Sequence, residues 1–200
     1  MINSKYLIYS SVILLLCLPS CNNRESALKS SPLANQKLKT RDELKQSIKY
    51  MEDSIVGLLK NPKTASKIPS LTHIELINRL KNYYRGFPSD IYSAECLFKI
   101  HVKYSDLNAL KNSVAYGDTL LTNFPTFSNR DFLLESIGSS YDIGIEPRDT
   151  AMVRKYYTLL LKETKLTPEK RQDIQMRLKF IKLNFMEYAE FRAKQAIKSK

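Results

Sequence analysis

The stretch from Phe87 to Leu161 contains one pattern twice, and this repetition decides the fold. The first half of the pattern occurs with an offset of 37 positions, as Phe87-Pro88, Leu97, Ile100, Tyr104 and as Phe124-Pro125, Leu134, Ile137, Tyr141. The second half occurs with an offset of 39, as Val114-Thr119-Leu120-Leu121 and as Val153-Thr158-Leu159-Leu160. A period of about 40 residues that holds two helical patterns is typical of stacked helix hairpins.

Outside this stretch the chain also favours helices. It has five glycines and no tryptophan, and apolar residues recur at helical spacing. We therefore expect an all-α domain of about seven helices, a stack of antiparallel hairpins (an α-solenoid). The expected helices cover 42–60, 72–85, 90–104, 107–123, 128–142 and 149–163, followed by a long C-terminal helix that begins at Thr167-Pro168.

Polar residues and glycine predict where these helices begin and end. Asp90, Asp106 and Asp149 are suited to the N-cap position, and the segment from Thr72 to Glu75 matches a capping box. Gly86 suits a left-handed C-cap.

The long C-terminal helix has a broad apolar face. One stripe comprises Ile174, Leu178, Ile181, Phe185 and Tyr188/Ala189, and a second comprises Met176, Phe180 and Leu183. Either this face packs on the preceding hairpin and closes the stack, or it binds a partner.

The first twenty-one residues combine a positive charge, an apolar run and a cysteine. Lys5 precedes an apolar run from Leu7 to Leu18, which is shorter than the ~20 residues of a transmembrane helix and suits a signal peptide. The run ends in Leu18-Pro19-Ser20-Cys21, which resembles the lipobox of bacterial lipoproteins. This resemblance implies that residues 1–20 are removed and that Cys21 receives lipid. An ordinary signal peptide or an uncleaved anchor is the alternative.

Residues 21–40 are rich in Ser, Asn and Lys and show no apolar period. We expect a tether from the lipidated Cys21 with a reach of roughly 25 Å, followed by the helical domain at 41–200. Asn22 differs from the aspartate that holds enterobacterial lipoproteins in the inner membrane. The expected location is therefore the cell envelope, on the outer membrane facing the periplasm.

Charge is unevenly distributed along the chain. The net charge is +12, and residues 150–200 hold 13 Lys and Arg against 5 Asp and Glu. An anionic membrane or an acidic protein fits such a segment, and so does a solvated basic face; nucleic acid does not fit an envelope location. The predicted basic surface comprises Arg171, Arg177, Lys179, Lys182, Arg192, Lys194 and Lys198.

The repeated segments resemble a known family. Phe87 to Tyr104 is similar to the first helix of a tetratricopeptide-type repeat, and Asp149 to Lys162 is similar to the second. The chain resembles small helical-repeat lipoproteins of Bacteroidetes-like bacteria. It is more distantly similar to the lipoprotein subunit of the outer-membrane β-barrel assembly machinery. The resemblance implies a scaffold that holds a partner protein.

Residues suited to catalysis or metal binding are scarce. His73 is expected at the surface and His101 in the core or at its rim, and neither has a second His or Cys at a metal-ligand spacing. Cys96 is expected to be an inert buried thiol. No nucleophile motif and no phosphate-binding glycine loop is present. We expect no enzyme, no cofactor and no metal site.

The tyrosine content is the remaining feature that indicates a binding function, because tyrosine is favoured at protein interfaces. Of the twelve tyrosines, Tyr92 and Tyr116 are the first candidates for partner binding. The expected function is a membrane-anchored, non-catalytic interaction scaffold that binds envelope proteins. A glycan- or peptide-binding accessory lipoprotein is the alternative, and a hydrolase comes third.

Overall fold

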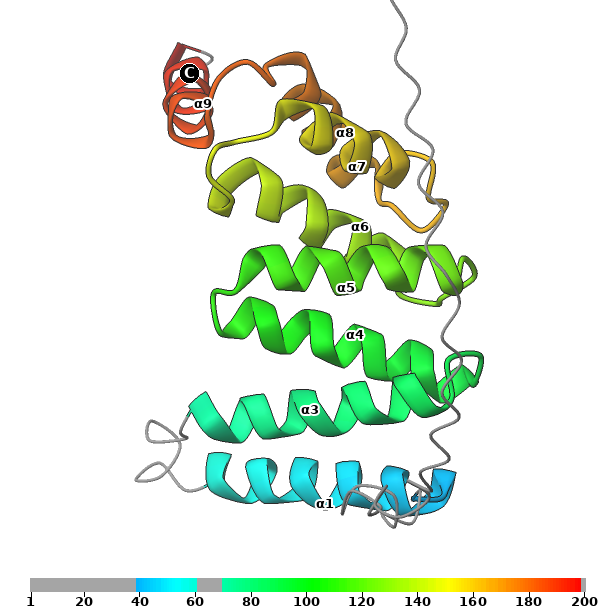
Figure 1. The fold of residues 1–200 in the computed structure, drawn as a ribbon. Helices are drawn as coiled ribbons and strands as arrows, with labels where there is room; N and C mark the ends of the chain where they lie inside the picture. Colours follow the sequence, from blue (N-terminus) through cyan, green and yellow to red (C-terminus); the bar gives the residue numbers. More distant parts are fainter. Residues whose placement is uncertain (1–38, 61–69, 199–200) are drawn as a thin grey trace, which may run out of the picture. The chain divides into compact units, whose positions relative to one another are not determined.

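The computed structural model describes residues 39–60 and 70–198, and within these ranges the chain is all-helical, without strands (Figure 1). The prediction of an all-α chain is therefore confirmed. The described ranges hold eight α-helices and one π-helical turn. These elements are α1 (Arg41–Leu59), α3 (Ser70–Gly86), α4 (Ile91–Asp106), α5 (Leu110–Asn123), α6 (Arg130–Ser139), η2 (Ser140–Gly144), α7 (Thr150–Leu160), α8 (Pro168–Lys179) and α9 (Phe185–Lys198).

From α1 to α8, each helix packs against the next helix along the chain (Figure 1). Side chains of each helix from α1 to α6 also bond to the helix after the next one along the chain. These bonds divide the helices into two sets. The first set is α1, α4, α6 and α8, and its connections are Glu52–Lys99 at 2.7 Å, His101–Ser136 at 2.9 Å and the Glu135–Lys170 ion pair.

The second set is α3, α5 and α7. Asn123 of α5 donates to the Tyr84 hydroxyl of α3 at 2.9 Å, and the Tyr156 hydroxyl of α7 donates to Asp118 of α5. Successive helices therefore alternate between the two sets.

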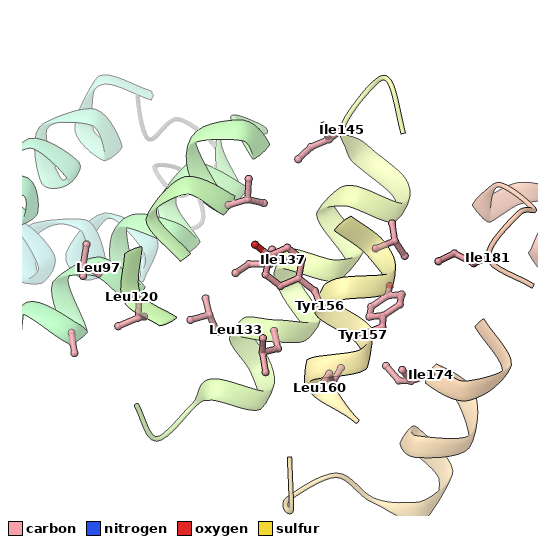
Figure 2. Close-up of a cluster of buried hydrophobic side chains, with 14 residues drawn as sticks. Leu97, Leu120, Leu133, Ile137, Ile145, Tyr156, Tyr157, Leu160, Ile174 and Ile181 are labelled. Atoms are coloured by element: carbon pink, nitrogen blue, oxygen red, sulfur yellow. The ribbon is translucent and has the colours of Figure 1, made fainter. Parts of the chain in front are cut away.

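The apolar core has two parts that meet at α4. One face of α4 contributes Cys96 and Ile100 to a cluster with α1 and α3. Another face contributes Ala94 and Leu97 to the cluster that continues through α5, α6 and α7. Figure 2 shows this second cluster extending from Leu97 and Leu120 to Ile174 and Ile181. Of the period-37 positions, the aliphatic ones are fully buried on both copies, at Leu97, Ile100, Leu134 and Ile137, whereas the aromatic ones are half-buried.

Two glycines allow close contact inside this core. A Cβ atom on Gly138 of α6 would lie 2.6 Å from the Tyr157 ring, and one on Gly117 of α5 would lie 2.7 Å from Ile137. The absence of a side chain lets the neighbouring helices approach at both positions.

Several predicted caps are confirmed. Asp90 accepts from the Tyr92 N–H, Asp149 accepts from the N–H groups of Ala151 and Met152, and Thr167 accepts from the Lys170 N–H. These side chains accept hydrogen bonds from N–H groups of the first helical turn that otherwise have no partner within the helix.

Two boundaries around α3 are wrong in the sequence prediction. Helix α3 begins at Ser70, so Thr72 lies in its first turn and is not the N-cap. Gly86 is the last residue of α3, and no described glycine has a positive φ angle. The backbone stays helical there because the Phe87 N–H still bonds to the Tyr83 carbonyl at 2.9 Å.

The predicted cap at Asp106 is also wrong, because Asp106 ends α4. Asn108 has a φ angle of 54°, in the left-handed region, and its N–H bonds to the Ser105 carbonyl at 2.9 Å. The Ala109 N–H bonds to the Tyr104 carbonyl at 2.8 Å. This pair of bonds is the Schellman arrangement, for which asparagine is a suitable residue. Helix α5 consequently begins three residues later than predicted, at Leu110.

The helix predicted over 128–142 starts later and changes its winding. Helix α6 runs from Arg130 to Ser139, and η2 continues it as a π-helical turn, closed by the Ile145 N–H bonding to the Ser140 carbonyl at 2.9 Å. A peptide bond in the cis form joins Glu146 to Pro147 in the following loop.

The predicted long C-terminal helix is two helices. Helix α8 ends at Lys179, and α9 starts at Phe185 with its own capping pair, because Asn184 and Glu187 exchange hydrogen bonds of 2.7 and 2.9 Å. At the break, Arg177 donates to two carbonyls of the segment that follows α8, those of Phe180 and Leu183, at 3.0 and 2.9 Å.

Candidate functional site

Two stacked tyrosine pairs occupy matching places in successive hairpins. Tyr104 of α4 stacks on Tyr116 of α5, and Tyr141 of η2 stacks on Tyr156 of α7, each with 5.7 Å between ring centroids. Tyr104 and Tyr141 are the repeat-related positions of the sequence pattern, 37 residues apart. The pairs differ in the polar side chain beside them.

The first pair holds a lysine of the protein itself. Lys81 of α3 places its ammonium group 5.0 Å from the Tyr104 ring centroid and 5.1 Å from that of Tyr116. It also donates to the Tyr104 hydroxyl at 2.6 Å. Burial works to lower the pKa of Lys81, but hydrogen bonds with both tyrosines outweigh it, so the pKa is raised above its ordinary value.

The second pair has a carboxylate beside it. Asp118 of α5 accepts from the hydroxyl of Tyr156, which is fully buried. Burial and the charge of Asp118 both raise the pKa of Tyr156 and of Tyr141. Tyr141 is half-buried, so its ring is the accessible one of the pair.

A groove lies between α5 and η2 at this second pair, and we name it the α5–η2 groove. Its first part has a volume of about 360 Å³ and is lined by Lys111, Val114, Ala115, Asp118, Tyr141 and Ile145. Its second part, of about 290 Å³, shares Lys111 and Ile145 and is lined otherwise by Asn108, Ala109, Leu110, Asn112, Gly144 and Glu146.

Unusual backbone shapes this groove. The left-handed Asn108 turns the chain into α5, and the π-helical turn η2 forms the opposite wall. Gly144 lets the two walls meet, because a Cβ atom on it would overlap the Leu110 side chain. Left-handed non-glycine residues and π-turns are enriched at functional sites, which makes this groove the leading candidate site.

The groove combines an apolar floor with separated charges. Val114 and Ile145 are buried, whereas Lys111 is exposed and Asp118 is half-buried. Lys111 and Asp118 are seven positions apart on α5, which corresponds to about 10 Å of helix. Such a site can hold a ligand that carries both a cation and an acceptor group.

The two tyrosines predicted to bind a partner do not form one site. Tyr92 is half-buried between the Tyr83 ring, 4.9 Å away, and the Lys45 ammonium, 5.0 Å from its own ring. Tyr116 stacks on Tyr104, which follows Tyr92 by twelve positions along α4, or about 18 Å. Packing inside the domain occupies much of both rings.

The predicted basic surface is only partly a surface. Lys179, Lys182, Arg192 and Lys194 are exposed. The side chain of Lys198, in α9, lies outside the described part of the structure. Placing Arg177 on this surface was wrong. Arg177 is 6% exposed, and half-buried Arg171 donates to the carbonyls of Leu161 and Glu163.

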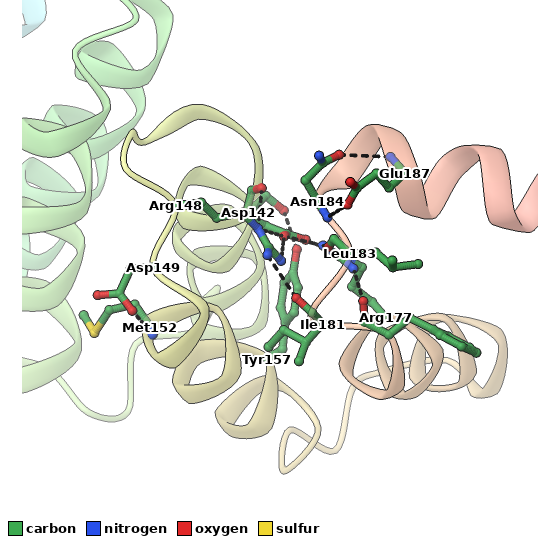
Figure 3. Close-up of polar contacts among 12 residues, drawn as sticks. Asp142, Arg148, Asp149, Met152, Tyr157, Arg177, Ile181, Leu183, Asn184 and Glu187 are labelled. Atoms are coloured by element: carbon green, nitrogen blue, oxygen red, sulfur yellow. Dashed lines mark hydrogen bonds and ion pairs between the residues drawn. The ribbon is translucent and has the colours of Figure 1, made fainter.

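Arg177 belongs to a buried ion cluster around Asp142 (Figure 3). Asp142 of η2 is 3% exposed and accepts from Arg177 at 2.6 and 2.7 Å and from Arg148 at 2.6 and 3.0 Å. Arg148 also donates to the Ile181 carbonyl at 2.9 Å. The cluster joins η2 to the segment between α8 and α9. Periodicity could not reveal it, because Arg148 and Arg177 look like ordinary surface charges in the sequence.

The remaining chemically reactive residues are placed as follows. His101 is fully buried, as predicted, and its ring nitrogens lie 2.9 Å from the hydroxyls of Ser113 and Ser136. Burial lowers its pKa. Cys96 is also fully buried, and burial raises its pKa to about 12. His73 is half-buried and not exposed as predicted.

Residues 39–60 and 70–198 contain no group of three or more His, Cys, Asp or Glu side chains placed to hold a metal ion. No helix in these ranges has both the length and the hydropathy to cross a membrane. The signal peptide, the Cys21 lipidation site and the tether predicted before Lys39 lie outside the described residues.

Comparison of the chain with protein-family models, with curated proteins and with solved structures finds no match.

Proposed function

We propose that this protein is a membrane-anchored lipoprotein whose helical domain is a non-catalytic scaffold for another protein of the cell envelope. The anchor is Cys21, proposed from the lipobox-like segment Leu18 to Cys21. Acylation at two or three positions gives stable membrane anchoring, whereas one chain is marginal. The expected location is the outer membrane, facing the periplasm.

The observation that supports the scaffold is that side chains of one helix bond to the helix after the next one along the chain. Helices arranged in two alternating sets, with a sequence period near 40, are what a tetratricopeptide-like stack of antiparallel hairpins requires. In such a stack one set of helices lines an extended surface that binds a partner. We place this surface on the first set, α1, α4, α6 and α8.

An aromatic side chain is available on that set. Phe132 of α6 is 54% exposed and lies 5.8 Å from the ring of Phe98 on α4. Ion pairs lie on either side, Glu52–Lys99 between α1 and α4, and the Glu135 pair between α6 and α8. An exposed aromatic residue between charged residues is a common centre for a protein interface.

The test is capture of the intact lipoprotein from detergent-solubilised envelopes after photo-crosslinking. A photoreactive amino acid is placed at Phe132, and separately at Met186 of α9, which is 69% exposed. We expect one envelope protein to crosslink stoichiometrically from position 132 and not from position 186. The Phe132→Ser substitution should abolish its co-purification, and Met186→Ser should not.

Recovery of the protein alone under mild conditions, with no crosslink from position 132, would contradict the scaffold. The anchor is tested separately by metabolic labelling with a fatty-acid analogue. The label should be absent from the Cys21→Ser variant.

The α5–η2 groove supports a second candidate function, an accessory lipoprotein that binds a peptide or a glycan. The accessible Tyr141 ring and the charges of Lys111 and Asp118 are suited to such ligands. This function requires binding in the groove without a protein scaffold partner, so a crosslink from position 132 separates the two candidates.

A further inference from the structure

Lys81 and Asp118 occupy equivalent places in two successive units. Lys81 stands six positions before Phe87, and Asp118 stands six positions before Phe124, the two residues that mark the repeat. Both lie on helices of the second set, α3 and α5. Each contacts the stacked tyrosine pair of its own unit.

The first unit shows which group such a tyrosine pair can hold. There the cation comes from the chain itself, since the Lys81 ammonium lies about equally far from both rings. A cation over an aromatic ring is attracted by the negative face of the ring. In the second unit the equivalent position supplies a carboxylate, and the accessible ring of Tyr141 lines the α5–η2 groove.

The surroundings of Asp118 suit a cation. Its carboxylate receives one hydrogen bond, from Tyr156, and the second oxygen has no partner among the described residues. Among the described residues, the cation that lies over this pair is Lys155, 4.7 Å from the Tyr156 centroid, and it donates to the Tyr156 hydroxyl at 3.3 Å. The Tyr141 ring is not among its cation–π partners.

We propose that the α5–η2 groove binds a lysine side chain of a partner protein, with the ammonium group between Asp118 and Tyr141 and its aliphatic stem on Val114 and Ile145. A charge-assisted bond to the carboxylate and the ring face together select a cation. The apolar stem fits the buried floor, as lysine stems do on apolar surface. Lys111, at the other end of the groove, then meets a backbone carbonyl or an acidic residue of the same segment.

This inference rests on the proposed function and adds a second contact for the partner, because α5 belongs to the second set of helices and the groove lies apart from the surface on α1, α4, α6 and α8. Its test uses a small probe and no partner protein. A negative result therefore leaves the crosslinking test of the scaffold unaffected.

The probe is Nα-acetyl-L-lysine methylamide, titrated into the full-length chain in detergent micelles with ¹³C-labelled tyrosine. A ligand of this size is expected to bind with a Kd of ~1 mM. The Tyr141 resonance, assigned with Tyr141→Phe, should shift and saturate. Nα-acetyl-L-norleucine methylamide, which has the stem without the charge, should cause no saturable shift.

Three variants locate the site. Asp118→Asn keeps the side-chain size and can still accept from Tyr156, and it should weaken binding by at least about tenfold. Asp118→Lys reproduces the lysine of the first unit and should abolish binding while thermal unfolding shows an intact fold. Glu146→Gln removes a carboxylate of the same groove away from the rings and should leave the Kd unchanged.

Equal Kd values for the wild type and Asp118→Asn, or equal shifts with the norleucine probe, would overturn the proposal. Loss of binding in Glu146→Gln to the same degree as in Asp118→Asn would also overturn it. That result would show general attraction by negative charge and no specific site.

Discussion

The middle of the domain and its C-terminal end are held together by different forces. Helix α6 is ten residues long and buries Leu133, Leu134 and Ile137. Helix α8 is twelve residues long, and its buried residues are Ile174 and Arg177. Apolar burial can therefore hold α6, whereas α8 depends also on the directional bonds of the Asp142 cluster. Helix α9 contacts Phe180 through the rings of Tyr188 and Phe191. A helix with little apolar surface can still be positioned if a buried charge is fully bonded.

The largest expected effect comes from removing the carboxylate of this cluster. Asp142→Ala leaves Arg148 and Arg177 with their positive charges uncompensated, which costs about 3–5 kcal/mol for a buried ion pair. Urea unfolding followed by circular dichroism measures the loss. Asp173→Ala is the matched control, because the Asp173–Arg192 pair is exposed and spans 3.6 Å. Equal stability losses in the two variants would mean that the buried cluster contributes no more to the free energy of unfolding than an exposed ion pair.

A smaller loss is expected from overpacking the apolar middle. Gly138→Ala forces a Cβ atom against the Tyr157 ring, and overpacking costs about 1–3 kcal/mol. Gly57→Ala is the control, because nothing lies within 4 Å of that position in α1. It should stabilise the protein by about 0.5–1 kcal/mol, since alanine favours helix over glycine. A Gly138→Ala variant as stable as the wild type would show that α6 and α7 can move apart freely.

His101 tests the polar contacts inside the apolar middle through pH. Burial holds its folded-state pKa below the ordinary 6.5, although a hydrogen bond with Ser113 opposes this. Below about pH 6.5 the unfolded chain takes up a proton that the folded chain does not. Stability should therefore fall as the pH decreases from 6.5 toward the folded pKa, by at most ~1.4 kcal/mol per pH unit.

The measurement is the free energy of unfolding of the wild type and of His101→Gln between pH 7.5 and 5.5, two values chosen to stay above the carboxylate titrations at about pH 4. The variant should show a flatter dependence than the wild type. Parallel curves would assign the pH dependence to other groups.

The smallest expected effect concerns the start of α9. Asn184→Ala removes the acceptor of the Glu187 N–H, and the loss of such an N-cap costs typically about 1 kcal/mol. Hydrogen exchange of the α9 amides should accelerate, with little change in the middle of the domain. Gln195→Ala, an exposed change in the same helix, should leave the exchange rates unaltered. Faster exchange throughout the domain would show that α9 supports the middle as well.

The sequence by itself determined the helical class, the apolar face of several helices and several helix starts. These depend on local properties: the spacing of apolar residues buries one face of each helix, and Asp90, Asp149 and Thr167 bond to N–H groups two or three positions away. The C-terminal break also had a local signal that the periodicity obscured, because Asn184 and Glu187 have the spacing of a capping box.

Only the tertiary structure decided the buried charges and the candidate site. Arg177 is buried because it meets Asp142, 35 positions earlier in the chain, and Asp118 is fixed by Tyr156, 38 positions later. No local pattern distinguishes such a residue from a surface charge of the same type. The same reason applies to Tyr92 and Tyr116. Only the packing of α5 on α4 shows that Tyr116 stacks on Tyr104, about 18 Å along α4 from Tyr92.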